Sequence, residues 1–481
     1  MNGYLWPAIP ALVILVLQLI FIGVILSRQK PNPAATLAWI VVILGVPLVG
    51  FALYLLIGEV RLGRRRIERH REIVRRIVSR ATPPRDVLRM MRPEVPMQYR
   101  AIASLGESVS HHVVQAGNAV DFIDQADEMA RLMVKDIDAA EHHCHLLYYI
   151  YLTDAIGQQV ADALSRAAQR GVSCRLLVDA VGSRSFLKSA LSRELKRAGV
   201  QVVDALPANL LRVAFSRVDL RNHRKIAIID GKIAYTGSHN IACEDFAPKK
   251  KYSPWHDISV RVQGPIVRDL QMIFVEDWYL DTDESLEELL DISPGVIEDG
   301  VSAQIMGSGP NAYNEAMRQL KHAAFHAARE ELLITTPYFV PDEATATAIC
   351  SAARRGVETT LIVPARNDSR LVAIASRSYY DMLLEAGVRL HEYQDGLLHA
   401  KTMTIDRELA LVSTANLDRR SFELNFEVSV AIYDSDCASQ LRYLQRSYLS
   451  RSKPVRLKGW RQRGLPRRLW QNAIGILSPL L

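Results

Sequence analysis

Cysteine is scarce in this chain of 481 residues, and its few copies follow no pattern. The five cysteines are scattered, odd in number and without a Cys-x-x-Cys pair: Cys144, Cys174, Cys243, Cys350 and Cys437. A disulfide framework would need paired cysteines, and a structural zinc site would need closely spaced ones. Neither a disulfide framework nor a zinc site is therefore indicated, and a reducing compartment is favoured.

Acidic residues are missing from the C-terminal stretch. Residues 451–481 hold eight Lys or Arg and no Asp or Glu, and residues 59–80 hold nine Arg against three Glu. Residues 1–58 hold +2 and the whole chain is formally +7, so residues 81–450 carry −9. A nuclease is expected to have a basic groove in its catalytic part, whereas basic flanks suit an anionic lipid surface. We therefore expect anionic membrane lipids, and no nucleic acid, as partners.

Two long apolar runs lie near the N-terminus, at about 4–26 and 34–57. Each is long enough to cross a hydrocarbon core of about 30 Å. The first run lacks the basic start of a signal peptide and is too long for its apolar part. We predict two transmembrane helices within residues 1–58 and a basic juxtamembrane linker over 59–110. The positive-inside rule then places the N-terminus and everything after the second span on the cytoplasmic face.

One polar pattern occurs twice at the same spacing. The first copy has His223, Lys225, Asp230, Ser238 and Asn240, and the second copy has His399, Lys401, Asp406, Thr414 and Asn416. A duplicated core would preserve apolar positions, whereas here polar positions are preserved. The pattern therefore indicates a function and not only a repeated hairpin.

The spacing within each copy predicts which side chains act together. The residues that follow each His are strand-like, so His and Lys, two apart, project from one face of the strand. Asp230 and Asp406 lie an odd number of residues away, and Asp230-Gly231 is a turn signal, so we expect mainly a structural role for these two motif acids. The two Asn should return near the His and Lys. Two such sets supply a nucleophile and a general acid or base, while Lys and Asn hold phosphate oxygens. Neither a metal nor a cofactor is required.

The repeat extends beyond the motifs. Glycine following a helix and preceding a β-branched run recurs in the same order in both halves, for example at Gly171 and Gly356. We predict two duplicated α/β domains, at 111–295 and 296–450, that share one active site, followed by a basic amphipathic tail over 451–481. That tail mixes Trp460, Trp470 and Ile474 with basic residues, which is typical of a segment lying on anionic lipid.

The doubled motif resembles the signature of the phospholipase D superfamily, His-x-Lys-x4-Asp followed by Gly-Ser/Thr-x-Asn. Both copies match except at Ser413, where the pattern has Gly. The resemblance implies that the motif residues His, Lys and Asp are catalytic and that Ser238, Thr414, Asn240 and Asn416 bind the substrate phosphate. In the family a downstream acid orients each His. We expect Glu427 to serve His399 and Asp257 to serve His223.

The N-terminal region and the tail narrow the resemblance to bacterial cardiolipin synthases of the phospholipase D type. Leu37-Ala38-Trp39, Pro47, Tyr54 and the Ser478-Pro479-Leu480-Leu481 ending carry it. It implies an inner-membrane enzyme that transfers a phosphatidyl group from one phosphatidylglycerol to another through a phosphohistidine, giving cardiolipin and glycerol. A hydrolytic membrane phospholipase D, a membrane-anchored nuclease and a non-catalytic lipid-binding scaffold are the alternatives. The near-symmetric motifs do not decide which His is the nucleophile.

Overall fold

The structure is a computed structural model that describes residues 8–27, 33–58, 62–81, 93–207, 217, 219–310 and 315–476. The chain divides into two compact units. One consists of residues 1–64 with 208–220, and the other, which we call the catalytic unit, consists of residues 65–207 and 221–481. The predicted motifs all lie in the catalytic unit.

The N-terminal unit differs from the predicted pair of spanning helices. Helix α1 (Ala8–Ser27) is long and apolar enough to cross a membrane, but the second run is broken into α2 (Pro33–Gly45) and α3 (Pro47–Ile57). Pro47 has no N–H to donate to the preceding turn, so the helix stops before it. At about 1.5 Å per residue, neither piece reaches across a core of about 30 Å. The structure therefore supports one spanning helix, and the two-helix hairpin is not confirmed.

The three apolar helices pack on one another. A Cβ at Gly50 would lie 2.9 Å from the Ile43 backbone, so only glycine allows α3 to approach α2 this closely. The rings of Phe21 and Phe51 stack at 4.6 Å, and Trp39 meets Tyr54 edge-on at 5.4 Å. The break at Pro47 thus folds the second run back on itself.

The catalytic unit is built on one 16-stranded sheet made of two equivalent halves. Outward from its centre, the first half runs in the order β1-β9-β7-β6-β2-β3-β4 and the second in the order β10-β19-β17-β16-β11-β13-β14. Two short strands complete the sheet: β20 (Ser452–Pro454) pairs with β14, and β5 (Arg221–Asn222) pairs with β19. Strands β1 and β10 pair antiparallel and join the halves. The first-half bounds are β1 (Gln115–Ile123), β2 (His143–Tyr148), β3 (Ser173–Asp179), β4 (Gln201–Ala205), β6 (Lys225–Ile229), β7 (Ile233–Gly237) and β9 (Ser259–Gln263). The second-half bounds are β10 (Val301–Ser308), β11 (Glu331–Thr335), β13 (Glu358–Pro364), β14 (Arg389–Tyr393), β16 (Thr402–Ile405), β17 (Leu409–Ser413) and β19 (Asn425–Tyr433).

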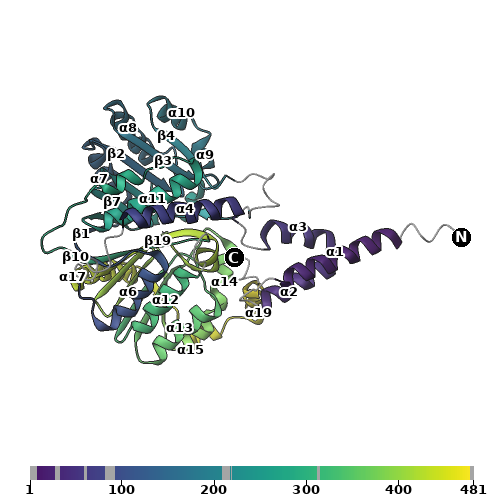
Figure 1. Cartoon of the computed structure of the whole chain (residues 1–481). Helices are drawn as coiled ribbons and strands as arrows, with labels where there is room; N and C mark the ends of the chain where they lie inside the picture. The colour runs from purple at the N-terminus through teal and green to yellow at the C-terminus, as the bar shows by residue number, and fades with distance from the viewer. Residues whose placement is uncertain are drawn as a thin grey trace. The chain divides into compact units, whose positions relative to one another are not determined.

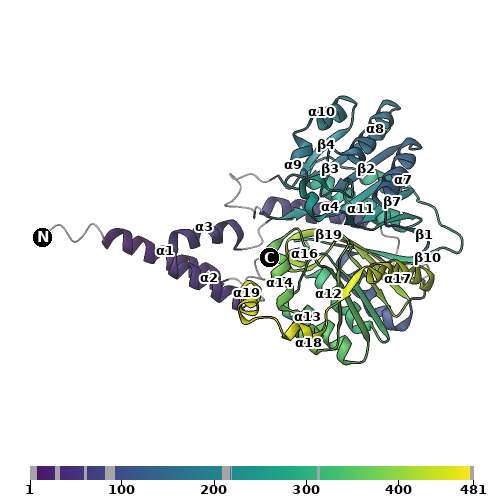
Figure 2. The same cartoon turned by 180° about the vertical axis from the view of Figure 1, so that it is seen from behind.

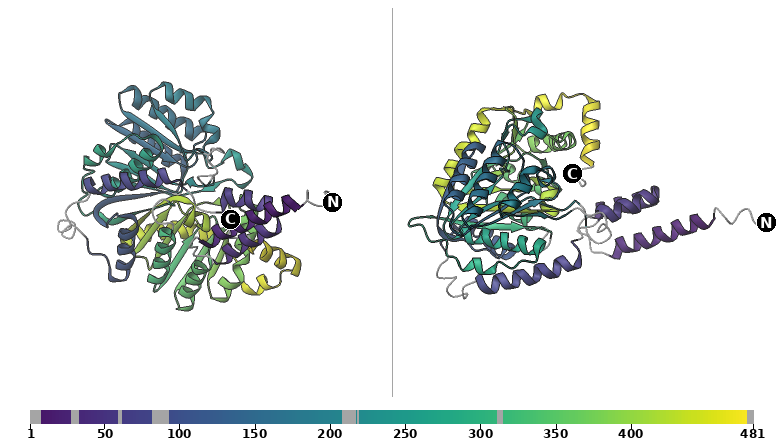
Figure 3. Two further views of the ribbon diagram at one scale, coloured as in Figure 1. Left: turned by 45° about the vertical axis from the view of Figure 1, so that its right-hand side comes forward. Right: turned by 90° about the horizontal axis from the view of Figure 1, so that it is seen from above.

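Helices cover both faces of this sheet, which explains why its strands are apolar on both sides. One core lies under α11 (Ile266–Thr282) and α17 (Ser435–Ser450) and is shared by both halves. The opposite face is covered by α7 (Ala126–Asp138), α8 (Ala155–Gln169) and α10 (Ala190–Arg197) in the first half, and by α6 (Arg100–Ser110), α12 (Ala316–Ala327), α13 (Glu343–Arg354) and α15 (Tyr380–Glu385) in the second. Figures 1 and 3 show the two halves in contact along the central strands. The predicted duplication of α/β domains is therefore present.

The expected basic linker contains a helix that belongs to the catalytic unit. Helix α4 (Arg64–Ala81) packs Ile73 and Ile77 into the core under α11. Its basic residues pair with acids on and after α11, as Arg66 does with Asp281 at 2.6 Å. The arginine-rich sequence of this stretch is thus partly used to attach α4 to the catalytic unit.

Candidate active site

Short strand pairs bring each motif His against the other half of the catalytic unit. Strand β5 (Arg221–Asn222) pairs with β19, and the His223 N–H donates to the Phe426 carbonyl at 2.9 Å. In the same way β8 (Trp255–His256) pairs with β15 (Leu397–Leu398), and the His399 N–H donates to the His256 carbonyl at 2.7 Å. Each His therefore lies beside the acid-bearing segment of the opposite half.

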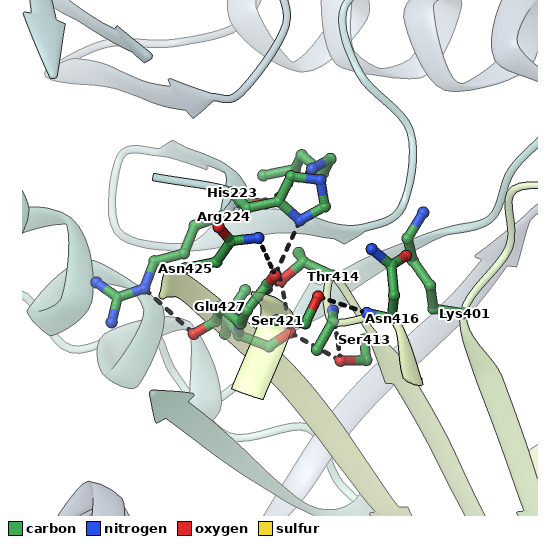
Figure 4. Close-up of polar contacts among 12 residues, drawn as sticks. His223, Arg224, Lys401, Ser413, Thr414, Asn416, Ser421, Asn425 and Glu427 are labelled. Carbon is green, nitrogen blue, oxygen red and sulfur yellow. Dashed lines mark hydrogen bonds and ion pairs between the residues drawn. The ribbon is translucent and has the colours of Figure 1, made fainter. Parts of the chain in front are cut away.

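The histidines and acids consequently pair across the two halves. His223 Nδ1 lies 2.9 Å from Glu427 Oε2, and His399 Nδ1 lies 2.6 Å from Asp257 Oδ1. The expected pairing, Glu427 with His399 and Asp257 with His223, was wrong. Counting residues along the chain could not reveal the crossed strand pairs β5·β19 and β8·β15. Figure 4 shows the His223 ring directed at Glu427.

Glu427 has more hydrogen-bond donors than Asp257. Its Oε2 accepts from the hydroxyl of Thr414 as well as from His223, and its Oε1 accepts from Asn425 Nδ2 at 3.1 Å (Figure 4). Among the described residues, the only hydrogen bond to the Asp257 carboxylate comes from His399. The two His–acid pairs are therefore similar in layout but unequal in support.

Ser238 and Thr414, expected to bind phosphate, have their hydroxyls engaged within the protein. Thr414 Oγ1 accepts from the Val428 N–H at 2.9 Å while donating to Glu427. Ser238 Oγ accepts from the Ile258 N–H at 2.9 Å and donates to the Ile258 carbonyl at 3.3 Å. The hydroxyls of both residues hold the acid-bearing strands in place, and phosphate binding by these two residues stays a prediction.

We expect Thr414→Val to lower kcat about tenfold with little change in KM, because Glu427 loses a donor that fixes its orientation. Ser238→Ala is the matched control, since its hydroxyl meets only backbone atoms, and it should stay within about threefold of the unaltered protein. Both variants should lose similar stability in thermal unfolding. Equal losses of kcat in the two variants would contradict a specific role for the Thr414 hydroxyl.

The two lysines are buried beside the histidines. Lys225 and Lys401 are 1% and 2% exposed. Lys401 Nζ lies 3.0 Å from His399 Nε2 and donates to the His399 carbonyl at 2.6 Å, while Lys225 Nζ donates to the His223 carbonyl at 2.7 Å. Burial, and then the charge of Lys401, lowers the pKa of Lys225 to about 7, and burial lowers the pKa of Lys401 to about 8. A bound anion would stabilise the charged ammonium groups and so raise these two pKa values again.

Burial also sets the protonation of the imidazoles. It lowers the pKa of His223 and of His399 to about 4, although the neighbouring carboxylates oppose the shift. Burial opposes ionisation of Glu427, but the charge and hydrogen bond of His223 outweigh it and lower that pKa to about 2. His399 acts on Asp257 in the same direction. Near pH 7 both acids are therefore ionised, and both imidazoles are neutral with Nδ1–H directed at an acid, which leaves each Nε2 with a lone pair.

The two motif asparagines lie at the same site. Asn240 Oδ1 accepts from the Ile150 N–H at 3.1 Å, which fixes the orientation of its amide group. The Asn416 N–H donates to Ser421 Oγ at 3.1 Å, and Figure 4 shows its side chain beside Lys401. The structure thus brings together His223, His399, Lys225, Lys401, Asn240, Asn416, Asp257 and Glu427.

Asp230 and Asp406, the motif acids, do not join this group. Asp230 lies in a turn with φ +52° and accepts from the N–H groups of Glu141, His142 and His143, each at 2.8 Å. Asp406 has φ +51° and accepts from residues 329–331 in the same manner. Their inclusion among the catalytic residues is therefore corrected, and the structural role expected from their position holds.

Ser413, the departure from the family signature, is accommodated by local hydrogen bonds. Its counterpart Gly237 has φ +136°, and a Cβ there would lie 2.4 Å from the Ile258 carbonyl. Ser413 is not among the residues with positive φ. Its Oγ is 2.7 Å from Ser429 Oγ and accepts from the Ala415 N–H at 2.9 Å. In the first copy of the motif, His239 Nδ1 lies 3.0 Å from Ser259 Oγ, so His239 contacts Ser259 as Ser413 contacts Ser429.

Several residues near the site have no signal in the motif. The ring of Tyr149 is 4.8 Å from that of His223, and the ring of Trp255 is 4.8 Å from that of His399. Arg224 is buried and donates to Asp277 at 2.8 Å and to the Glu427 carbonyl at 3.2 Å. Tyr149 and Tyr338 occupy equivalent positions in the repeat, and this equivalence is a sequence signal for aromatic rings near the two histidines. No such signal exists for Arg224, because its partner Asp277 on α11 lies too far along the chain to be found from spacing.

The arrangement can perform a two-step displacement at phosphorus. It offers two Nε2 atoms, two ammonium groups and two amides in one buried group, the combination that phosphoryl transfer needs. Within the described ranges, His, Cys, Asp and Glu side chains form no group that could hold a metal ion.

Comparison with known proteins identifies the family of the chain. Residues 133–278 and 322–446 match the family described as "Cardiolipin synthase, PLD-like domain", and residues 12–59 match "Phospholipase_D-nuclease N-terminal". The chain is 37% identical over 461 residues to Cardiolipin synthase A of Serratia proteamaculans and 36% identical over 464 residues to that of Yersinia pseudotuberculosis, covering 95% of both chains in each case.

A solved structure shows the same fold. The crystal structure of phosphatidylserine synthase from Haemophilus influenzae matches with a TM-score of 0.60 at 15% identity, covering 79% of this chain and 100% of that one. With the doubled motif, the duplicated sheet and full-length relatives in agreement, this chain belongs to the cardiolipin synthase family of the phospholipase D superfamily.

Proposed function

We propose that this protein is a cardiolipin synthase that transfers a phosphatidyl group from one phosphatidylglycerol to the hydroxyl of a second, releasing glycerol. The observation that carries the proposal is the crossed arrangement of two neutral, buried imidazoles, each held by a carboxylate of the other half. Such a pair can take and return one phosphatidyl group without a cofactor.

In the first step, His223 Nε2 attacks the phosphorus of the donor phosphatidylglycerol. The bond from phosphorus to the glycerol oxygen breaks, and His399 gives that oxygen a proton. His399 is neutral in the free protein, and the negative charge of the bound phosphodiester raises its pKa so that it can carry this proton. Lys225, Lys401, Asn240 and Asn416 stabilise the charge that develops on the phosphoryl oxygens.

In the second step, His399 removes the proton from the acceptor hydroxyl of another phosphatidylglycerol. The acceptor oxygen then attacks the phosphohistidine, the phosphorus–nitrogen bond breaks, and cardiolipin forms. One phosphodiester replaces another, so the step is reversible. Lys401 at 3.0 Å from His399 Nε2 supports the acid–base role of His399, since no such donor contacts His223 Nε2 in the described chain.

The test of the function is a product analysis. In mixed micelles with phosphatidylglycerol labelled in its headgroup, we expect cardiolipin and glycerol in equal amounts. Phosphatidic acid with glycerol and no cardiolipin would show that water is the acceptor, and a hydrolytic phospholipase D would replace the proposed function. The burial of His223 and His399, which are 7% and 4% exposed, favours transfer because it limits access of water.

The lysine pKa values give a prediction for pH dependence. Raising the pH through about 7 to 8 removes the charges of Lys225 and Lys401, so kcat/KM should fall over this range. Lys225→Arg keeps its charge at all these pH values, which leaves Lys401, with a pKa of about 8, as the group that titrates. The maximal activity of Lys225→Arg should be lower, but its decline should begin at higher pH. A wild-type profile that stays flat to pH 10 would contradict the shifted lysines.

We also propose that the catalytic unit faces the cytoplasm of a bacterial cell and that the N-terminus lies on the same side. The arginine-rich stretch after residue 58 supports the first part. The second part requires α2 and α3 to open from their folded-back arrangement and form another crossing. An epitope at the N-terminus of the full chain should then be protected from protease in intact spheroplasts, and digestion there would leave α1 as the single crossing.

A further inference from the structure

Helix α19 (Leu465–Ile476) presents apolar side chains on two sides. On the inner side, Ile474 is buried with Val340 and Ala375, the latter on α14 (Arg370–Ser378). A Cβ at Gly475 would lie 2.7 Å from Ser378 Oγ, so the two helices are in close contact. Figure 2 shows α18 (Leu457–Arg461) and α19 beside the second half of the catalytic unit.

The C-terminal segment is attached to this position by further contacts. Arg463 pairs with Asp381 and lies over the ring of Trp460 at 4.2 Å, and Arg461 donates to Glu385 at 2.6 Å. Trp460 in turn packs on Tyr380 at 4.9 Å. Trp460 and Ile474, predicted to face lipid, thus face the protein, and α19 is held in place.

The outer side of α19 is more apolar than a solvent-facing side should be. Leu465, Leu469, Trp470 and Ile476 are 64%, 60%, 59% and 78% exposed. At about 100° per residue, these four side chains span an arc of about 140° on the helix, and Arg467 and Arg468 lie outside the arc, one on each side. Arg467 and Arg468 are also exposed, and neither has an acidic partner in the part of the chain that the structure describes. Neighbouring leucines, a tryptophan and unpaired arginines fit the boundary between acyl chains and anionic headgroups.

Contacts connect this surface to the active site. Helix α14 is preceded by a loop in which Asn367 donates to the Pro337 carbonyl at 2.8 Å and Asp368 accepts from the Tyr338 hydroxyl at 2.8 Å. The Tyr338 ring is 6.2 Å from that of His399. Leu371, in the first turn of α14, is 47% exposed. The helix on which α19 rests therefore begins beside the reaction centre.

We propose that the outer face of α19, comprising Leu465, Leu469, Trp470 and Ile476 and flanked by Arg467 and Arg468, docks on the surface of an anionic lipid bilayer and holds the active site at the level of the headgroups. The proposal deepens the proposed function, since a phosphatidylglycerol phosphodiester lies at that level. It assigns to one helix face a role distinct from anchoring by α1, because an anchor keeps the protein at the membrane but does not orient it.

The first test uses the full chain in proteoliposomes of phosphatidylglycerol and phosphatidylethanolamine and in detergent mixed micelles. Leu469→Asp/Trp470→Asp should lower activity in bilayers about tenfold and leave micellar activity within about twofold, because in micelles detergent and lipid reach the site from any side. The matched control is Tyr443→Asp, a charge placed at another exposed ring, 76% exposed on α17. Equal losses in both media, or an equal loss in the control, would overturn the proposal.

The second test does not depend on activity and separates this proposal from the proposed function. Lipids brominated on their acyl chains should quench the part of the tryptophan fluorescence that Trp470→Phe removes, and more strongly as the phosphatidylglycerol fraction rises. Absence of that quenching would overturn the proposal even if cardiolipin forms, and quenching would support it even if the product is phosphatidic acid. A concentration-dependent dimer in detergent that the Leu469→Asp/Trp470→Asp variant abolishes would assign the face to a second copy of the chain instead.

Discussion

His223→Ala should abolish cardiolipin formation, with a loss of at least about 10⁴-fold, because it removes the atom that bonds to phosphorus. His399→Ala should cause a loss of similar size for a different reason, since it removes the proton donor and acceptor. Phosphatidylglycerol labelled at phosphorus and a rapid quench in alkaline detergent, in which a phosphorus–nitrogen bond survives, distinguish the two. Label should remain on the His399→Ala protein and be absent from His223→Ala.

The control for this experiment is His239→Ala, which removes a buried imidazole that bonds to Ser259 and not to an acid. It should form labelled protein and cardiolipin at rates within about tenfold of the unaltered chain. Label on His223→Ala but not on His399→Ala would reverse the two roles and leave the crossed geometry intact. Label on neither, with activity in the unaltered protein, would contradict a phosphohistidine.

Glu427→Gln should lower kcat about 10³-fold or more, and more than Asp257→Asn. Both oxygens of Glu427 already accept hydrogen bonds, from His223, Thr414 and Asn425. An amide has only one oxygen, so its NH2 must face one of these donors, and the His223 tautomer is lost or Asn425 is displaced. Asp257 serves only His399 in the described structure, so an asparagine there can turn its oxygen to the ring.

The measurement is single-turnover transfer by both variants, together with thermal unfolding. Glu427→Asp serves as the control, since it keeps the charge but is too short to meet all three donors, and its activity should fall between those of the unaltered protein and Glu427→Gln. A larger loss for Asp257→Asn than for Glu427→Gln would contradict the unequal support of the two pairs.

The sequence was most informative where function constrains it. The two motif copies predicted which residues meet, because an alternating strand places His and Lys on one face wherever that strand lies in the sheet. The glycine-strand repeats predicted the two α/β halves for the same reason, since each is a local signal. The pairing of His223 with Glu427 was missed because it depends on β5 joining β19 across 204 residues.

Other features of the structure could not be predicted because they depend on packing and not on composition. The apolar run 34–57 satisfies a length rule for a membrane span, but Pro47 interrupts its hydrogen bonding. The arginines after residue 58 remain the topology signal, but the sequence did not show that Arg66 and its neighbours also pair with acids on and after α11. Ile474 has the same character as Ile476 in sequence, and only the position of α14 decides which of them is buried.

The crossed His–acid pairs have a consequence for how the two halves can change. Either half alone would carry one histidine and the acid meant for the other, so neither should retain even a partial reaction. The two halves are duplicated in fold, but neither can replace the other in function. A substitution that shifts β19 would displace the acid that holds His223, and one that shifts β8 would displace the acid that holds His399. We therefore expect exchange of one half for that of a relative to succeed only when the residues of β5, β8, β15 and β19 are exchanged as a set.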